Sequence, residues 1–259
     1  MELLRRVVWV LANIYGRVAG RRWLASFHHA LLLFSLHGLG YDNGLRDSFT
    51  GEHWFIRNVL KRANIRIALD IGANVGVYSR MLRAELDCEV HAFEPSSAAF
   101  AQLSKSTDQR IHAYQTAIAD QEGTATLYAK QPASPTASLH AGIGGPNAEP
   151  VPVTTIDAFC VREGITAVDF VKIDTEGYER EVLHGMRETI ARLQPRYVQF
   201  EFNIMHLRRG YTVYDLSQLL PGYSLYRLLP RGWLPIVPNQ FINNIFMFSN
   251  VVAVRGTKE

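Results

Sequence analysis

The heptapeptide Asp70-Ile71-Gly72-Ala73-Asn74-Val75-Gly76 joins two contrasting patterns in the chain. Before it, residues 65–71 form a short apolar run that predicts a buried strand. After it, residues 74–85 have the apolar spacing of a helix. Glycines at such a turn let the backbone come close to a ligand, and the first turn of a helix presents free N–H groups. We therefore expect a strand, a ligand-binding turn and a helix in this order.

Strands and helices continue to alternate on both sides of this unit. A strand over residues 88–93 ends at Glu94-Pro95, and Ser96 can cap the helix that follows. Further expected elements are a helix capped by Thr50, strands over 110–115, 168–173 and 197–202, a helix over 179–193, and apolar runs over 223–229 and 245–254. Strands that alternate with helices of this length predict an α/β fold with a parallel sheet.

Two acids near the turn indicate which cofactor the unit binds. Glu94 ends the second strand, where a carboxylate can accept hydrogen bonds from a ribose diol. A nicotinamide dinucleotide would place its pyrophosphate beside Asp70, which would repel it, whereas S-adenosylmethionine carries an ammonium and a sulfonium group that Asp70 would attract. The turn also lacks the second and third glycines of the G-x-G-x-x-G pattern. These features favour S-adenosylmethionine.

Three motifs, in this order, resemble the FkbM family of methyltransferases. They are residues 70–79, Ala92-Phe93-Glu94-Pro95, and Val171-Lys172-Ile173-Asp174-Thr175-Glu176-Gly177-Tyr178-Glu179. The resemblance covers about residues 48–203 and implies a class I (Rossmann-like) methyltransferase fold, in which a seven-stranded, mostly parallel sheet lies between helices. It further implies that the enzyme methylates a hydroxyl of a small molecule or glycan, such as a sugar or polyketide-type acceptor. We expect residues 47–259 to form this domain, after an N-terminal helical extension over residues 1–46.

The resemblance also implies a set of residues that bind S-adenosylmethionine. They lie ahead of the first strand, around the glycine turn, and after the second, third and fourth strands: Glu52, Asp70, Gly72, Ala73, Asn74, Gly76, Tyr78, Ser79, Glu94, Pro95, Ala117, Ile118 and Asp174. Gln115 departs from the pattern, because many relatives have Asn at this position. The contacts to adenine are therefore the part of the set that the resemblance supports least.

Four side chains are candidates for catalysis, because methyl transfer to an alcohol needs a base or a metal near the hydroxyl. Asp174 and Glu176 follow the fourth strand, where they could orient the hydroxyl, share a proton, hold a divalent cation or simply cap the next helix. Glu201 and His206 follow the fifth strand and are expected to face the same cleft. His206 is considered as a base because imidazole titrates near neutrality. No metal site is assigned.

Charge and cysteine content limit the possible partners. The net charge of +3 is local, because residues 1–30 carry five arginines and one acid, whereas the rest of the chain has 22 basic and 23 acidic residues. A nearly neutral body offers no broad positive field for a nucleic acid. Cys88 and Cys160 occur without a Cys/His cluster, which favours a reducing, cytoplasmic location.

Residues 2–19 repeat apolar side chains at helical spacing and predict an amphipathic helix, and a second helix is expected from Leu24. Arginines of the first helix could contact anionic lipid headgroups as a peripheral membrane contact. Packing of its apolar stripe on the protein's own body is the favoured expectation. Polar residues interrupt each apolar stretch, so neither a signal peptide nor a transmembrane span is predicted.

Residues 130–152 interrupt the alternation of strands and helices. They contain five of the eleven prolines together with three glycines, and this composition predicts a long loop. A loop of this length in a compact domain is usually a mobile lid or a functional segment, although a solvated insertion without a role would have the same composition.

Other functions remain open on the sequence alone. A nicotinamide-dependent sugar oxidoreductase would use the same strand–turn–helix unit, and NADH binding would distinguish it. A non-catalytic membrane-associated module would recruit partners through residues 2–36, but the presence of Asp70, Glu94 and Asp174 argues against a decayed site. A nucleic-acid methyltransferase is disfavoured by the charge balance and by the lack of an Asn/Asp-Pro-Pro-aromatic motif after the fourth strand.

Overall fold

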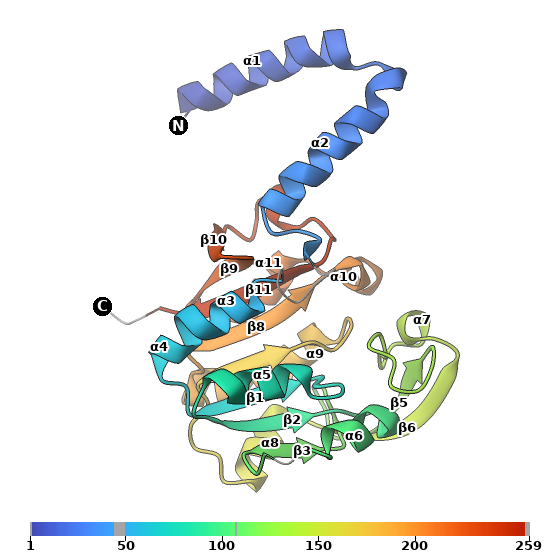
Figure 1. The fold of residues 1–259 in the computed structure, drawn as a ribbon, viewed down its shortest axis with the longest axis vertical. Helices are drawn as coiled ribbons and strands as arrows, with labels where there is room; N and C mark the ends of the chain where they lie inside the picture. The colour runs from blue at the N-terminus through green and yellow to red at the C-terminus, as the bar shows by residue number, and fades with distance from the viewer. Residues whose placement is uncertain (1, 44–49, 107, 257–259) are drawn as a thin grey trace.

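The centre of the molecule is an eight-stranded sheet, drawn as a ribbon in Figure 1. The computed structural model describes residues 2–43, 50–106 and 108–256. Within these residues the strand order is β10-β9-β11-β8-β7-β1-β2-β3. The predicted α/β fold with a mostly parallel sheet is confirmed, with one difference: the sheet has eight strands where seven were expected.

Five adjacent strands of the sheet are parallel and carry the candidate site at one edge. They are β1 (Ile67–Ile71), β2 (Glu89–Phe93), β3 (Ile111–Tyr114), β7 (Phe170–Ile173) and β8 (Tyr197–Phe202). The three central strands β1, β7 and β8 are buried almost throughout, because helices cover both faces of the sheet. Their carboxyl ends meet at the edge where open α/β sheets bind ligands.

The remaining three strands pair antiparallel with their neighbours. They are β9 (Tyr223–Leu229), β10 (Gly232–Ile236) and β11 (Ser249–Arg255), and two of them correspond to the apolar runs expected over 223–229 and 245–254. β10 is the strand that exceeds the expected seven, because it forms a tight hairpin with β9. Pro235 is tolerated in β10 because an edge strand has one side without a pairing partner.

The sheet separates two hydrophobic cores. On one face, buried side chains of α8 (Ile156–Arg162), α9 (Glu179–His184) and α11 (Val213–Gln218) pack against β7 and β8. On the other face pack α5 (Val77–Glu85) and a continuous helical segment made of α3 (Glu52–Phe55), η3 (Ile56–Leu60) and α4 (Lys61–Ala63). Cys88 and Cys160 are buried and free, one in each core.

The helix boundaries follow local capping. α6 (Ser97–Leu103) begins where predicted, because the Ser96 hydroxyl accepts a hydrogen bond from the backbone of Ala99. The first helix after Thr50 instead has Gly51 at its N-cap. The helix expected over 179–193 is divided into α9 and the π-helical η4 (Thr189–Leu193). The remaining short elements are α10 (Ile204–Arg209) and η5 (Phe241–Asn243).

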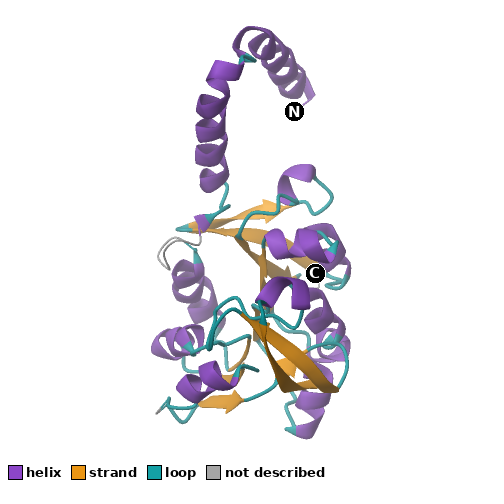
Figure 2. Cartoon of the chain, turned by 90° about the vertical axis from the view of Figure 1, so that its right-hand side faces the viewer, coloured by secondary structure: helices purple, strands orange, loops and turns teal. Residues whose placement is uncertain are grey.

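The predicted loop over residues 130–152 is wrong for part of its length. Residues 147–152 belong to β6 (Asn147–Thr154), which pairs with β4 (Ala117–Ile118) and β5 (Gly123–Ala129) in a three-stranded sheet. This sheet, together with α7 (Ala141–Gly144), stands beside the carboxyl edge of the central sheet (Figures 1 and 2). Pro150 and Pro152 fit into β6 because only β5 pairs with that part of the strand.

Two N-terminal helices stand away from the body in both views (Figures 1 and 2). They are α1 (Glu2–Ala19), as predicted, and α2 (Ala25–Gly38), joined by η1 (Arg22–Leu24). The expectation that the apolar stripe of α1 packs on the protein's own body is wrong, since Trp9 and Val18 are each 70% exposed. None of the helices in the described ranges is long and apolar enough to cross a membrane.

Candidate active site

A cavity of about 400 Å³ opens at the carboxyl edge of the parallel strands. Its walls are the glycine turn after β1, the segment after β2, β4 and the loop after β7. Residues 134–139 of the insertion between β5 and β6 line the opposite side. We call this space the first cavity; its volume lies within the usual range for a small-molecule site.

The glycine turn approaches the neighbouring strand so closely that a side chain would not fit. Gly72 has φ of +82°, and a Cβ atom added there would lie 1.8 Å from the carbonyl oxygen of Asp174. The backbone N–H groups of Gly72 and Ala73 both donate to the carbonyl of Phe93, at 3.0 and 2.9 Å. The turn is therefore fixed against β2 and β7, and its backbone forms part of the cavity wall.

Glu94 is held in the wall of the first cavity by two backbone groups. Its carboxylate accepts hydrogen bonds from the N–H of Asn74 at 2.8 Å and from the N–H of Ser96 at 2.7 Å. Burial raises the pKa of Glu94 to about 7, although these hydrogen bonds act in the opposite direction. A carboxyl group fixed in this way keeps lone pairs that can accept hydrogen bonds from the hydroxyls of a ligand.

Asp70, which was expected to contact the cofactor, does not line the first cavity. It is 1% exposed, and its Oδ2 accepts a hydrogen bond from the hydroxyl of Ser79 at 2.6 Å. Burial raises the pKa of Asp70, and the nearby Lys172 counteracts this effect. The side chain lies beneath the glycine turn because β1 alternates its side chains between the two faces of the sheet. Asp70 therefore ties α5 to β1.

Lys172 forms a buried ion pair at the end of β7. Its Nζ lies 2.7 Å from Oδ2 of Asp174 and 4.9 Å from the ring centroid of Tyr78. Burial alone would lower the pKa of Lys172, but the carboxylates of Asp174, Glu52 and Asp70 raise it above its usual value. The lysine is therefore charged, and it fixes the orientation of Asp174.

A second cavity of about 520 Å³ lies on the other side of the glycine turn. Its wall includes Glu52 of α3, Tyr78 of α5 and Asn250 of β11. The two cavities share four lining residues, which are Gly72, Asn74, Asp174 and Glu201. We call this shared region the junction. A group bound in one cavity would meet a group bound in the other at this place.

A polar network supports the floor of the second cavity. The Tyr78 hydroxyl donates to Oε1 of Gln199 at 2.9 Å. The Nε2 of Gln199 donates to the carboxylate of Glu52 at 2.8 Å and to the amide oxygen of Asn250 at 3.3 Å. The network connects α3, α5, β8 and β11, so the shape of the second cavity depends on contacts between elements that are far apart in the sequence.

Two carboxyl groups near the junction have raised pKa values. Burial, together with the charges of Asp174 and Glu176, raises the pKa of Glu201 well above its usual value. Burial and the neighbouring carboxylates of Asp174 and Glu179 raise the pKa of Glu176 to about 8. Carboxyl groups tuned towards neutrality in a cavity are typical of groups that exchange protons during catalysis.

The backbone at Glu176 is in an unfavourable conformation. This residue has φ of +53°, a region that residues other than glycine adopt at an energetic cost. The Ser138 hydroxyl donates a hydrogen bond to the carbonyl of Glu176 at 2.9 Å. The loop over residues 174–178 follows β7, and we call it the acidic loop. The insertion between β5 and β6, residues 130–146, contacts this loop directly and can thus support its shape.

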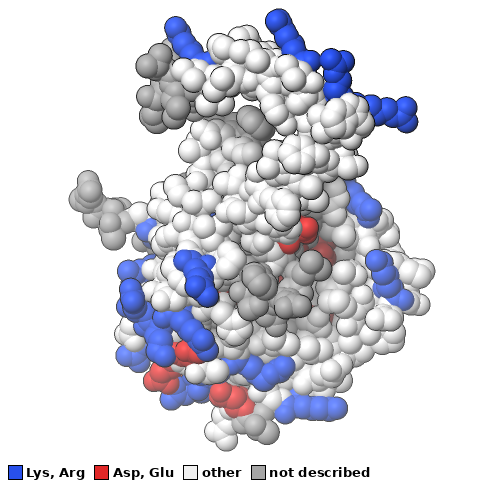
Figure 3. All heavy atoms as spheres, turned by 45° about the horizontal axis from the view of Figure 1, so that its top comes forward, with Lys and Arg blue, Asp and Glu red and all other residues white. Residues whose placement is uncertain are grey.

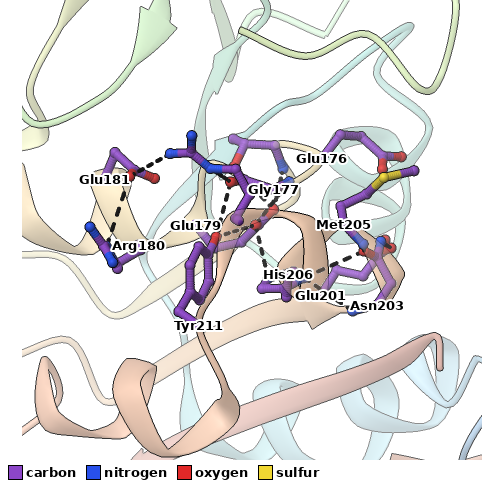
Figure 4. A network of polar contacts seen from close by, with 12 residues as sticks. Glu176, Gly177, Glu179, Arg180, Glu181, Glu201, Asn203, Met205, His206 and Tyr211 are labelled. Atoms are coloured by element: carbon purple, nitrogen blue, oxygen red, sulfur yellow. Dashed lines mark hydrogen bonds and ion pairs between the residues drawn. The ribbon is translucent and has the colours of Figure 1, made fainter. Parts of the chain in front are cut away.

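His206 is not a candidate base, because its imidazole is 0% exposed and lines neither cavity. Its Nε2 lies 3.1 Å from the carboxylate of Glu179, and its Nδ1 accepts from the backbone N–H of Asn203 at 3.2 Å (Figure 4). Glu179 in turn accepts hydrogen bonds from the N–H groups of Thr175 and Gly177. Burial would raise the pKa of Glu179, but His206 and these N–H groups hold it below its usual value.

The structure brings most of the predicted site residues together around the two cavities. Those that line at least one cavity are Glu52, Gly72, Ala73, Asn74, Tyr78, Glu94, Pro95, Ala117, Ile118, Asp174, Glu176 and Glu201. Those that line neither are Asp70, Gly76, Ser79 and His206. The excluded residues lie behind the turn or beneath the acidic loop, where they support the residues that form the walls.

Several lining residues were not predicted from the sequence. Thr116, Ser138 and Tyr178 contribute to the first cavity, and Asn250 contributes to the second. The β-branched stretch over residues 123–129 was a usable signal for β5, and hence for an insertion beside the site. Ser138 follows a proline-rich stretch and carried no such signal. Within residues 2–43, 50–106 and 108–256, no group of three or more His, Cys, Asp or Glu side chains could hold a metal ion.

Residues 70–224, more than half of the chain, match the family described as the methyltransferase FkbM domain. A curated relative is the 2-O-methyltransferase NoeI of Sinorhizobium fredii, strain NBRC 101917 / NGR234. It is 25% identical over 185 residues, which cover 64% of this chain and 75% of that protein.

Two solved structures align with much of the chain. The O-methyltransferase from Bacillus cereus, in complex with SAH, aligns over 95% of this chain and 97% of its own, with 11% identity and a TM-score of 0.45. A putative O-methyltransferase from Klebsiella pneumoniae aligns over 86% of each chain, with 13% identity and a TM-score of 0.43.

Proposed function

Because this chain belongs to the FkbM family of methyltransferases, we propose that it methylates a hydroxyl group of a small molecule or glycan with S-adenosylmethionine as methyl donor. Methylation that depends on S-adenosylmethionine follows from the family. The hydroxyl acceptor is our proposal. The observation that carries it is the junction, where Asp174 and Glu201 lie between two cavities.

The residues of the first cavity fit the parts of S-adenosylmethionine. Glu94 is a fixed acceptor suited to the ribose diol, and Ile118 and Phe93 offer an apolar surface suited to adenine. The acids at the junction suit the positive charges of the methionine part. The Oδ1 of Asn74 is buried, has no hydrogen-bond partner among the described residues and belongs to a residue that lines both cavities, so it can accept one further hydrogen bond.

S-Adenosylmethionine supplies a methyl group that is activated by the sulfonium charge. The protein's own task is to align the acceptor hydroxyl and to remove its proton. We assign proton removal to Glu201, because this carboxyl group lies at the junction and has a raised pKa. A positive charge bound nearby lowers the pKa of a carboxyl group, so cofactor binding would favour the carboxylate form that the base requires.

Asp174 has a different role from Glu201. Its ion pair with Lys172 fixes its orientation, so it is suited to hold a donor group in place at the junction. Glu52, Tyr78 and Asn250 surround the second cavity with polar groups that can hydrogen-bond to hydroxyls. The same wall also contains apolar side chains such as Met81 and Phe248, so it suits an acceptor that has both hydroxyl groups and apolar surface, as a sugar does. The relative NoeI is named a 2-O-methyltransferase, which supports the choice of oxygen as the methylated atom.

The test is methyl transfer from radiolabelled S-adenosylmethionine to a panel of methyl glycosides, polyketide alcohols and matched amines. We expect an O-methyl ether as the product. Replacement of Glu201 by Gln should lower kcat by roughly 100-fold, because general base catalysis contributes at least this much. The affinity for S-adenosylhomocysteine should stay within about threefold of the wild-type value, since this ligand lacks the sulfonium charge and Gln keeps the size and the hydrogen-bonding capacity of the side chain.

The matched control is Glu188→Gln, which makes the same chemical change at an exposed position on the surface. This variant should keep wild-type turnover. Methylation of the amines instead of the alcohols would contradict the proposed acceptor. Unchanged turnover in Glu201→Gln would remove Glu201 from the mechanism.

A further inference from the structure

The two N-terminal helices expose apolar side chains that no described part of the chain covers. We call residues 2–38 the N-terminal arm. Among its side chains from residue 6 onwards, only Leu36 is buried. Trp9, Trp23 and Phe34 are 70%, 78% and 76% exposed. Contiguous apolar surface of this kind marks a site of interaction in a folded protein.

The first helix of the arm is divided into an apolar and a basic side. Val7, Leu11, Ile14 and Val18 recur at spacings of four, three and four residues and thus share one face. Arg6 and Arg17, which are eleven residues apart, share a second line that lies about a quarter turn around the helix from this face. A helix with a broad apolar face flanked by arginines is typical of helices that lie in the plane of a membrane surface.

The second helix carries exposed apolar side chains around its circumference, with histidines and serines among them. The stretch from Trp23 to Tyr41 contains no Asp, Glu, Lys or Arg, and α2 exposes Phe27, Leu31 and Phe34. A helix that is hydrophobic all round is normally buried. With 14 residues, α2 is roughly 21 Å long, which is too short to cross the hydrocarbon core of a bilayer. The helix can bury its apolar side chains by entering the membrane surface without spanning the bilayer.

The charge of the arm indicates that it binds a membrane rather than a second copy of this chain. Five arginines and no acid occur between residues 3 and 41. Figure 3 shows Lys and Arg, but no Asp or Glu, among the described residues of the arm on the face in view. A second copy would bring these positive charges together, whereas anionic lipid headgroups would neutralise them.

The arm is firmly attached to the body. The ring of Tyr41 is buried and lies 3.8 Å from the guanidinium of Arg227. The same arginine donates a hydrogen bond to the carbonyl of Leu39 at 3.3 Å. The N–H of Asp42 donates to the carbonyl of Phe248, a residue that lines the second cavity. The C-terminal end of the arm is therefore fixed near the second cavity.

We propose that the N-terminal arm is a docking surface for anionic membranes. The apolar face of α1 and the exposed side chains of α2 enter the boundary between headgroups and acyl chains. Arg17, Arg21 and Arg22 contact the anionic headgroups. The protein lies on the membrane and does not cross it, and this attachment is independent of the methyl-transfer reaction.

The test is co-sedimentation of the full-length protein with vesicles of phosphatidylcholine, with or without phosphatidylglycerol. We expect binding to the vesicles that contain phosphatidylglycerol, and weaker binding at high salt, because salt screens the attraction. The triple variant Arg17→Glu, Arg21→Glu, Arg22→Glu should bind them roughly 100-fold more weakly or not at all. The double variant Leu11→Ser, Ile14→Ser should also lose binding, since it removes apolar surface without a change of charge.

The matched control reverses three exposed arginines on the body, Arg62, Arg192 and Arg231. This variant should bind like the wild type. Equal binding by the two triple variants would overturn the proposal. The proposal would also be overturned if the wild type formed a dimer and did not bind vesicles, and if this dimer dissociated in Leu11→Ser, Ile14→Ser. The arm would then bind a second copy of the chain. Thermal unfolding of each variant, expected to match the wild type, shows that the body is intact.

Discussion

Single carboxyl groups differ in their surroundings at the junction, and these differences assign their roles. Asp174 is paired with Lys172 at 2.7 Å, so its position is fixed by a charge that the protein itself provides. Glu201 and Glu176 have no such partner at ion-pair distance among the described residues, and their pKa values are raised. A site that combines a fixed charged acid with acids whose pKa values are raised can orient a hydroxyl and also take its proton.

The raised pKa of Glu176 predicts a specific pH dependence of stability. Its pKa is about 8 in the folded protein, compared with the ordinary value of 4.5. Between these values the folded state holds a proton that the unfolded state has released, so this contribution to stability is lost as the pH rises from about 4.5 to 8. Glu176→Gln should not show this loss. Relative to wild type, it should gain roughly 1–3 kcal/mol of unfolding free energy between pH 5 and pH 8.5.

Urea unfolding at several pH values measures this difference, with Glu188→Gln as the exposed control. Parallel pH curves for wild type and Glu176→Gln would show that Glu176 is not buried in the way described here. Glu94 and Glu201 also have raised pKa values, and they remain in both proteins. The difference between the two curves therefore reports Glu176 together with its effect on the pKa of Glu201.

The sequence predicted which residues gather at the site better than it predicted which way they face. Glu94 and Asp174 follow the ends of parallel strands, and their positions alone place them at the ligand-binding edge. Asp70 and His206 are also near that edge, but both are buried. The direction of these side chains depends on Ser79 and Glu179, which contact them across the fold. A pattern of residue types does not contain this information.

At the level of elements, the glycine turn is the most constrained connection. Gly72→Ala would place a Cβ atom 1.8 Å from the Asp174 carbonyl and would also force alanine to φ of +82°. The turn must then move, so we expect a loss of several kcal/mol of unfolding free energy and loss of S-adenosylhomocysteine binding. Gly164 has φ of +66° with open space around it, so Gly164→Ala isolates the conformational cost, about 1–2 kcal/mol.

Thermal unfolding of the two variants separates the effects of contact and conformation. Equal melting temperatures would mean that the close approach of the turn to β7 has no energetic consequence. A larger drop for Gly72→Ala is the result that the structure predicts.

The loop between β7 and α9 depends on the contact of Glu179 with His206, as Figure 4 shows. Removal of the imidazole leaves the buried carboxylate of Glu179 without one of its polar partners and opens a cavity, so His206→Ala should lose about 2–4 kcal/mol of unfolding free energy. Addition of Glu179→Gln should restore part of this loss, because the neutral amide still accepts a hydrogen bond. Urea unfolding measures both variants, and His29→Ala on the exposed arm is the control. A loss below about 1 kcal/mol would show that the pair does not stabilise the loop.

The strands of the central sheet could be predicted because their apolar runs are continuous and end at glycine, proline or acidic residues. Strand β6 and the insertion before it could not be predicted, since the proline-rich stretch over residues 130–152 is typical of a loop. Pairing with β5 overrides this preference, and the prolines are accommodated on the side of β6 that has no partner there. The role of the insertion as a wall of the first cavity depends on tertiary contacts such as that of Ser138 with Glu176.

At the level of the whole molecule, the central sheet separates the tasks of the chain. Its parallel strands carry the two cavities, its antiparallel strands anchor the N-terminal arm through Arg227 of β9, and the two cores hold it between helices. The amphipathic pattern of residues 2–19 predicted α1 correctly. It did not show whether the apolar face packs on the body, because that outcome depends on where α2 leaves the sheet.

The central claim is that the first cavity binds S-adenosylmethionine with Glu94 as the acceptor for the ribose. Calorimetric titration of wild type and Glu94→Gln with S-adenosylhomocysteine, with NADH as the control ligand, tests it most directly. We predict binding of S-adenosylhomocysteine to wild type, binding weakened by roughly tenfold or more in Glu94→Gln because charged hydrogen bonds are lost, and no binding of NADH. Binding of NADH to wild type, or equal affinity of both proteins for S-adenosylhomocysteine, would contradict the account.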